Sequence, residues 1–178
     1  MCEFLEEFVM KSNGIVLVID AYCLYNRARG VSLVYPQDFI DACNLFHELK
    51  LPLKLRKFRS GLLAIQTSNS NFDHQKHAQY EPIIPANGSN PNPTFNIIPE
   101  FSKDKLYSLS LKCNDMFISR ILEIVSSFGS ISFIEYAAID NLPLTLATEL
   151  LLCAESAQIL CRDEVLEEIR FYLNIFYF

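Results

Sequence analysis

Three histidines and six cysteines are the side chains of this sequence best suited to metal binding or catalysis. His74 and His77 stand three residues apart beside Asp73, a spacing that could present ligands to one cation. Both lie in a polar stretch, which favours a solvated loop over a metal site. His47 falls within an amphipathic segment, where we expect a helix surface or a contact surface. No histidine has the surroundings of a catalytic triad.

The six cysteines could form a set of disulfides, but they follow no zinc pattern. The sequence contains no Cys-x-x-Cys pair and no His/Cys cluster. The first residues include Glu3, Glu6 and Glu7 in place of the basic region of a secretory signal, so we expect no leader. Since Cys23, Cys43 and Cys153 occupy apolar positions of expected helices, we predict buried, reduced thiols.

Glycine usage also argues against catalysis. The chain has only five glycines, and none of them forms the kind of run that cradles phosphate groups. With no nucleophile, acid/base pair or ligand cluster in a recognisable arrangement, the sequence predicts a protein that is not an enzyme. We likewise expect no cofactor and no catalytic or structural metal.

The elements that would position any site form a unit that occurs twice. The first copy is expected to comprise a strand over 15–19, a helix over 20–29, a helix over 36–50 and a hairpin over 53 to about 67. Gly30 ends the first helix, Pro36 begins the second, and Ser60-Gly61 forms the hairpin turn. The apolar faces predicted for the two helices consist of Ala21, Leu24, Tyr25 and Ala28, and of Phe39, Ala42, Cys43, Phe46 and Leu49.

The second copy repeats this order after an amphipathic helix. We expect a helix over 117–128, a short extended segment over 130–132, helices over 133–139 and from Pro143 onward, and a hairpin over 159 to about 176. The third of these helices should bury Ala147, Leu150, Leu151 and Ala154.

Helices followed by a hairpin, twice over, indicate a mainly α, α+β fold made of two tandem winged-helix domains. We place the first domain at residues 1–67 and the second at 105–178. Residues 68–104 are rich in asparagine and proline, which predicts a linker or an insertion between them.

Charge argues against nucleic acid as the main partner, although a nucleic-acid-binding winged helix stays the alternative. Residues 1–70 carry a net charge of +1 and residues 105–178 a net charge of −5. The basic residues of the first hairpin, Lys54, Arg56, Lys57 and Arg59, could touch phosphates. However, the helix that would enter a groove carries acidic side chains, which a polyanion repels. A basic strand face also protects an edge strand from unwanted pairing.

Three segments resemble a known family. These segments are 22–30, 51–56 with Ser60-Gly61, and 160–163 with 170–172. They resemble the vacuolar protein-sorting-associated protein 36 family of subunits of the ESCRT-II endosomal sorting complex. The resemblance covers about residues 14–67 and 117–176.

The resemblance implies a non-catalytic structural subunit that assembles with vacuolar protein-sorting-associated proteins 22 and 25. It further implies a role in sorting ubiquitinated membrane proteins into multivesicular bodies. The chain would then be cytoplasmic and reach endosomal membranes indirectly, through the complex.

The sequence departs from the family pattern in three ways. It lacks the family's lipid- and ubiquitin-binding GLUE domain, so we do not expect direct binding of lipid or ubiquitin. Residues 68–104 replace a shorter connection. Leu17 and Tyr35 stand where the family usually has serines that cap helices, and losing such a cap costs about 1 kcal/mol.

The resemblance also implies an interface for a Pro-rich segment of protein 25 on the second domain. Arg162 and Asp163 are the candidate polar anchors, beside an aromatic pocket formed by Phe171 and Tyr172. The alternative is that Arg162 and Asp163 only form the hairpin turn. The last nine residues hold five aromatic rings, and we expect some to be buried and others to serve an interface.

A second candidate interface lies at the end of the helix over 20–29. Asn26, Arg27 and Arg29 are the candidate contacts for protein 22. The alternative is that these basic side chains complement the dipole at the C-terminal end of their helix.

Overall fold

The computed structural model of the chain describes residues 1–68, 115–165 and 168–177. The first part contains α1 (Cys2–Lys11), β1 (Ile15–Leu17), α2 (Val18–Arg29), α3 (Pro36–Glu48), β2 (Leu53–Lys57) and β3 (Leu63–Thr67). The second contains α5 (Met116–Phe128), β4 (Ser130–Ser132), α6 (Phe133–Ile139), α7 (Leu144–Ser156), β5 (Leu160–Val165), β6 (Glu168–Leu173) and the 3-10 helix η2 (Ile175–Tyr177).

The two parts share one topology. In each, a helix precedes a short strand, two further helices and a two-stranded hairpin. The short strand pairs with the last strand, so the antiparallel sheets have the orders β1-β3-β2 and β4-β6-β5. This is the winged-helix arrangement, and it confirms the predicted α+β fold of two tandem winged-helix units. The proposed end of the first domain at residue 67 is the last residue of β3, whereas residues 69–104 of the proposed linker and the proposed start of the second domain at 105 lie outside the described residues.

Helix starts differ between the two units. In the second unit, Ser132 caps α6 in a capping box: its hydroxyl accepts the backbone N–H of Glu135, whose carboxylate accepts the N–H of Ser132. At the corresponding start of α2 stands Leu17, and at the start of α3 stands Tyr35; neither side chain caps its helix. The orphan N–H groups of α2 and α3 therefore lack the side-chain acceptor that stabilises α6.

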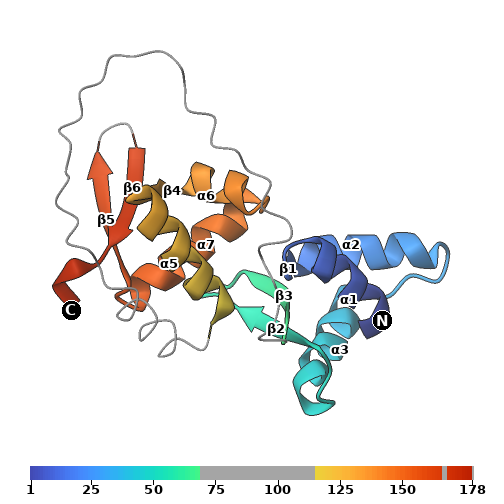
Figure 1. Ribbon diagram of the computed structural model, residues 1–178. Coiled ribbons are helices and arrows are strands. Elements are labelled where there is room, and N and C mark those ends of the chain that lie inside the picture. Colours follow the sequence, from blue (N-terminus) through green and yellow to red (C-terminus); the bar gives the residue numbers. More distant parts are fainter. Residues whose placement is uncertain (69–114, 166–167, 178) are drawn as a thin grey trace.

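Both faces of the sheet of the first unit pack against a hydrophobic core. Successive residues of a strand point to opposite faces. Val16 and Ile65, which are paired between β1 and β3, pack into a core formed with α1 and α3. Leu17 and its partner Ala64 instead join a cluster composed mainly of residues from the second unit. Figure 1 shows β1, β2 and β3 lying between the helices of the two units. One sheet therefore contributes side chains to two hydrophobic cores.

Arg56 adds polar contacts across the same boundary. Its guanidinium lies 2.7 Å from the carboxylate of Asp115, the N-cap residue of α5, and donates a hydrogen bond of 3.3 Å to the sulfur of Cys153 on α7. It also lies 4.8 Å from the centre of the Phe58 ring. The Arg56 side chain is only 15% exposed. The expectation that Arg56 forms part of an exposed basic face is therefore wrong.

A buried polar group lies at the end of α6. Arg120 pairs with Asp140 at 3.3 Å, and the Asn13 side chain of the first unit donates to the Asp140 backbone carbonyl. Burial raises the pKa of Asp140, against the opposing effect of Arg120. Burial and the Asp140 carboxylate also raise the pKa of Tyr136. These groups lie inside the protein, where they join the two units.

Some details of the helices differ from the sequence expectations. Helix α1, which was not predicted, buries Leu5 and Val9 in the first core. Helix α2 begins at Val18, so Tyr22 packs against the core while Ala28 is exposed. Leu49 and Phe128 are also exposed, because each lies at the end of its helix beyond the core. The buried face predicted for α7 is confirmed, with Leu146 added.

The cysteines divide by burial, and the expectation that Cys23 is buried is wrong. Cys43 is buried, Cys153 is partly buried, and Cys23 is exposed on α2. Burial, with a smaller effect of Cys2, raises the pKa of Cys43 to about 12.

These differences predict selective thiol modification. Because the thiolate is the reactive species, iodoacetamide at mildly alkaline pH should modify Cys23 rapidly and leave Cys43 unmodified in the folded chain. Peptide mapping by mass spectrometry measures both sites, and the chain in guanidinium should show them reacting alike. Rapid modification of Cys43 in the folded protein would contradict the described packing of α3.

Among the described residues, no single helix has the length and apolar composition to cross a membrane. The pair α6 and α7, two helices bent by 112°, meets those criteria only when taken together.

Candidate partner interfaces

The loop between α2 and α3 is held by side chains of α2. Asn26 makes two hydrogen bonds with the backbone of Val34: its side-chain oxygen accepts the N–H at 2.9 Å, and its amide donates to the carbonyl at 3.2 Å. The Tyr22 hydroxyl donates to the same carbonyl at 3.1 Å. Asn26 therefore orders the loop, and its polar atoms are already used.

Arg29 holds the same loop from its other end. Its guanidinium donates to the carbonyl of Ser32 at 2.5 Å and to the Ser32 hydroxyl at 3.2 Å. It also donates to the Tyr25 hydroxyl at 3.1 Å and lies 5.5 Å from the centre of that ring. Like Asn26, Arg29 holds the loop in place, and its guanidinium donors are already used within the chain.

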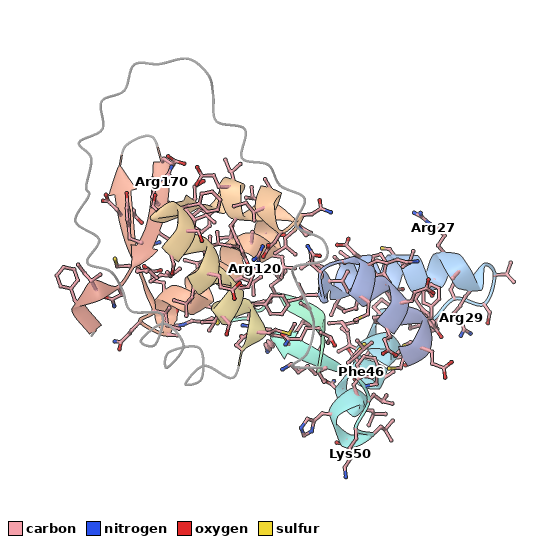
Figure 2. All side chains as sticks on the ribbon, viewed as in Figure 1. Arg27, Arg29, Phe46, Lys50, Arg120 and Arg170 are labelled. Carbon is pink, nitrogen blue, oxygen red and sulfur yellow. The ribbon has the colours of Figure 1, made fainter. Side chains whose placement is uncertain are left out.

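The ordered loop presents apolar side chains to solvent. Val31 is fully exposed, Leu33 is 65% exposed and Tyr35 is 77% exposed. Arg27 points away from α2 close to this loop, and none of the described residues pairs with it (Figure 2). We call Arg27, Val31, Leu33 and Tyr35 the tip surface. Exposed apolar side chains beside an unpaired arginine are typical of a protein interface.

Tyr35 belongs to the tip surface and is also the N-cap residue of α3. Replacing Tyr35 with serine should stabilise the folded chain by about 1 kcal/mol, because serine would cap α3 while the lost ring is exposed. Urea unfolding followed by circular dichroism measures this change. If Tyr35 serves binding, the same variant should bind its partner more weakly. A decrease in stability would contradict the described start of α3.

Arg162 and Asp163 lie within β5 and not in the turn of the second hairpin. Arg162 pairs with Phe171 of β6, and Asp163 pairs with Arg170. The interpretation that both residues only form the turn is therefore wrong. Since paired residues share a face, Arg162 lies on the side of the sheet that faces α7, where its guanidinium is 3.3 Å from Glu155. Asp163 lies on the opposite, exposed side.

Phe171 and Tyr172 also point to opposite sides, so they cannot form one aromatic pocket. Phe171 is fully buried, and its ring packs edge-on against Phe133 with the ring centres 4.9 Å apart. Tyr172 is 37% exposed and lies beside Cys161 and Ser130, its partners in the two neighbouring strands.

A second candidate surface remains on the outer side of this hairpin. Arg170 is held there by Glu135 at 3.0 Å and Glu168 at 2.8 Å, next to Asp163 in the register. Ile175 and Phe176 follow β6 and are exposed. We call Asp163, Tyr172, Ile175 and Phe176 the hairpin surface. Figure 1 shows η2 at one end of the molecule and the loop after α2 at the other.

The described residues contain no group of three or more histidine, cysteine, aspartate or glutamate side chains that could hold a metal ion. His74 and His77 lie outside the described residues. The features that stand out among the described residues are two separate surfaces.

Comparison with known proteins gives the family. The model of the EAP30/Vps36 family matches residues 1–164, which include the first winged-helix unit and the second unit as far as β5. The chain belongs to the EAP30/Vps36 family. Among its relatives are proteins called "vacuolar protein-sorting-associated protein 36". The relative from Xenopus laevis is 34% identical over 163 residues, and so is the one from Homo sapiens.

These alignments cover most of this chain but a minor part of its relatives. The Xenopus and human matches span 92% of the chain and 31% of each relative, so the chain spans about a third of their length. A solved chain from "Structure of the ESCRT-II endosomal trafficking complex" matches with 22% identity and a TM-score of 0.43, covering 91% of this chain and 76% of that one.

Proposed function

We propose that this chain is a non-catalytic structural subunit of an ESCRT-II complex. The observation that carries the proposal is membership of the EAP30/Vps36 family over residues 1–164. The described structure supports it, because the polar groups of the interior join the two units and the surfaces carry exposed apolar side chains.

The tip surface is the proposed contact for vacuolar protein-sorting-associated protein 22. It offers three exposed apolar side chains and the cation of Arg27, which has no ion-pair partner in the part of the chain that the structure describes. The bonds from Asn26 and Arg29 fix this loop before binding, which reduces the entropy lost when a partner docks.

The hairpin surface is the proposed contact for vacuolar protein-sorting-associated protein 25. A Pro-rich segment is extended in the free state and packs on exposed aromatic rings. Tyr172 and Phe176 supply such rings, and Asp163 supplies a polar anchor. Arg162 contributes less directly, because its guanidinium is engaged by Glu155 and Glu164.

Through this assembly the chain would take part in sorting ubiquitinated membrane proteins into multivesicular bodies. It would be cytoplasmic and would reach endosomal membranes indirectly, through its partners.

Charge reversals at the two surfaces test the proposal. In pull-downs with purified partners, Arg27→Glu should weaken binding of protein 22 and leave protein 25 bound, while Asp163→Lys should do the reverse. Each change should reduce affinity about tenfold or more, because interface substitutions that bring like charges together cost several kcal/mol. Circular dichroism of both variants should be unchanged. Normal binding of both partners to both variants would overturn the assignment of the surfaces.

A further inference from the structure

A pocket of about 500 Å³ opens between α3 and the hairpin of the first unit, away from both surfaces described above. Its apolar part is formed by Ile40, Cys43, Leu55 and Leu63, and its polar part by Asn44, His47, Lys54 and Lys57. We call these eight residues the α3 groove. The ion pairs and hydrogen bonds described above do not involve them.

The α3 groove differs in charge from the rest of the chain. The whole chain has a net charge of −6, yet none of the described residues lining the groove is acidic. The two lysines therefore make a local positive potential beside an apolar floor. A ligand that combines carboxylates with an aliphatic side chain would satisfy both parts.

The backbone beside the groove offers a further way to bind. Strand β2 is the outer strand in the order β1-β3-β2. Two backbone hydrogen bonds show which N–H and C=O groups of the β2 segment point toward β3. The Phe58 N–H donates to the Leu62 carbonyl, and the Ser68 N–H donates to the Pro52 carbonyl. By alternation, the N–H and C=O groups of Leu55 and Lys57 point away from β3. Such an edge can accept one more strand.

From these observations we propose that the α3 groove binds an extended, acidic segment of a partner protein. The segment would add to the edge of β2. An aliphatic side chain would pack on Ile40, Leu55 and Leu63, with one carboxylate on that face against Lys57 and another on the opposite face against Lys54. This interaction goes beyond the proposed assembly with proteins 22 and 25 and does not depend on it.

The same positive charge suits nucleic acid less well. Helix α3 also carries Asp38, Asp41 and Glu48 outside the groove, and these would face a bulky polyanion. Arg56, the neighbouring cation of β2, is already paired with Asp115. The apolar residues of the groove would have nothing to pack against on a phosphate backbone.

Fluorescence anisotropy with a labelled peptide that repeats Glu-Glu-Leu-Glu tests the proposal on the full chain, because such a strand presents leucine and glutamate together on one face. We expect saturable binding that Lys57→Glu weakens about tenfold or more. Lys11→Glu, the same charge change at an exposed site on α1, should leave the affinity within about twofold. Thermal unfolding establishes that each variant is folded, and Lys54→Glu is the replacement if Lys57→Glu is not.

Several results would overturn the proposal. One is the absence of binding of the glutamate–leucine peptide, and another is equal binding of a lysine–leucine peptide. Equal binding of a glutamate–serine peptide would show that the apolar floor contributes nothing. Tighter, Lys57-dependent binding of duplex DNA would assign the groove to nucleic acid instead. Loss of protein 22 or 25 from the Lys57→Glu variant would place the groove within the assembly interface.

Discussion

Replacing Phe171 with alanine should lower the free energy of unfolding by about 3–5 kcal/mol, the range measured for removing a buried phenyl ring. Phe171 is fully buried and packs edge-on against Phe133 in the larger core. Its removal would leave a cavity between the second sheet and its helices, which the backbone of β6 is too constrained to fill. Urea unfolding followed by circular dichroism measures the loss.

The neighbouring residue provides the matched control. Tyr172→Ala removes a ring of similar size from the exposed side of the same strand, so it should cost about 1 kcal/mol or less. Tyr172→Ala should also weaken binding of protein 25, whereas Phe171 is fully buried and cannot contact a partner. Equal destabilisation by the two substitutions would contradict the described orientation of β6.

Replacing Arg56 with alanine should cost about 2–3 kcal/mol, because it leaves Asp115 partly buried without its cation and removes the contacts of Arg56 with the second unit. Lys54→Ala, on the same side of β2 but exposed, should change stability by less than about 0.5 kcal/mol. Thermal unfolding of both variants makes the comparison.

The same thermal unfolding measurements test whether the two units unfold together. Because one sheet contributes to both cores, the unaltered chain should unfold in a single cooperative transition seen alike by different probes. We expect Arg56→Ala to lower the midpoint of that transition. Two separate transitions in the unaltered chain would mean that the shared sheet does not couple the units.

Much of the fold follows from local patterns in the sequence. The apolar spacing of α7, the Ser60-Gly61 turn and the alternation of Leu53 to Arg56 each specify an element by themselves. Joining two units across one sheet is a tertiary property that such patterns do not reveal. One signal was present: the unbroken apolar run of β1 is typical of a strand buried on both faces.

The site residues were harder to place for a related reason. Asn26 and Arg29 bond the backbone of Val34 and Ser32, and bonds of this kind depend on a loop path that residue types do not encode. The opposite orientations of Phe171 and Tyr172 could have been predicted, because adjacent strand residues alternate between faces. Helix α1 was missed because its buried face consists of only Leu5 and Val9.

The most direct test of the account is to mix the purified full chain with proteins 22 and 25 and measure the masses of the eluting species by size-exclusion chromatography with light scattering. If the chain is an assembly subunit, all three proteins should elute together in a species heavier than any one of them. Elution of this chain alone, at its own mass of 20.4 kDa, with both partners present and folded, would contradict the proposed function.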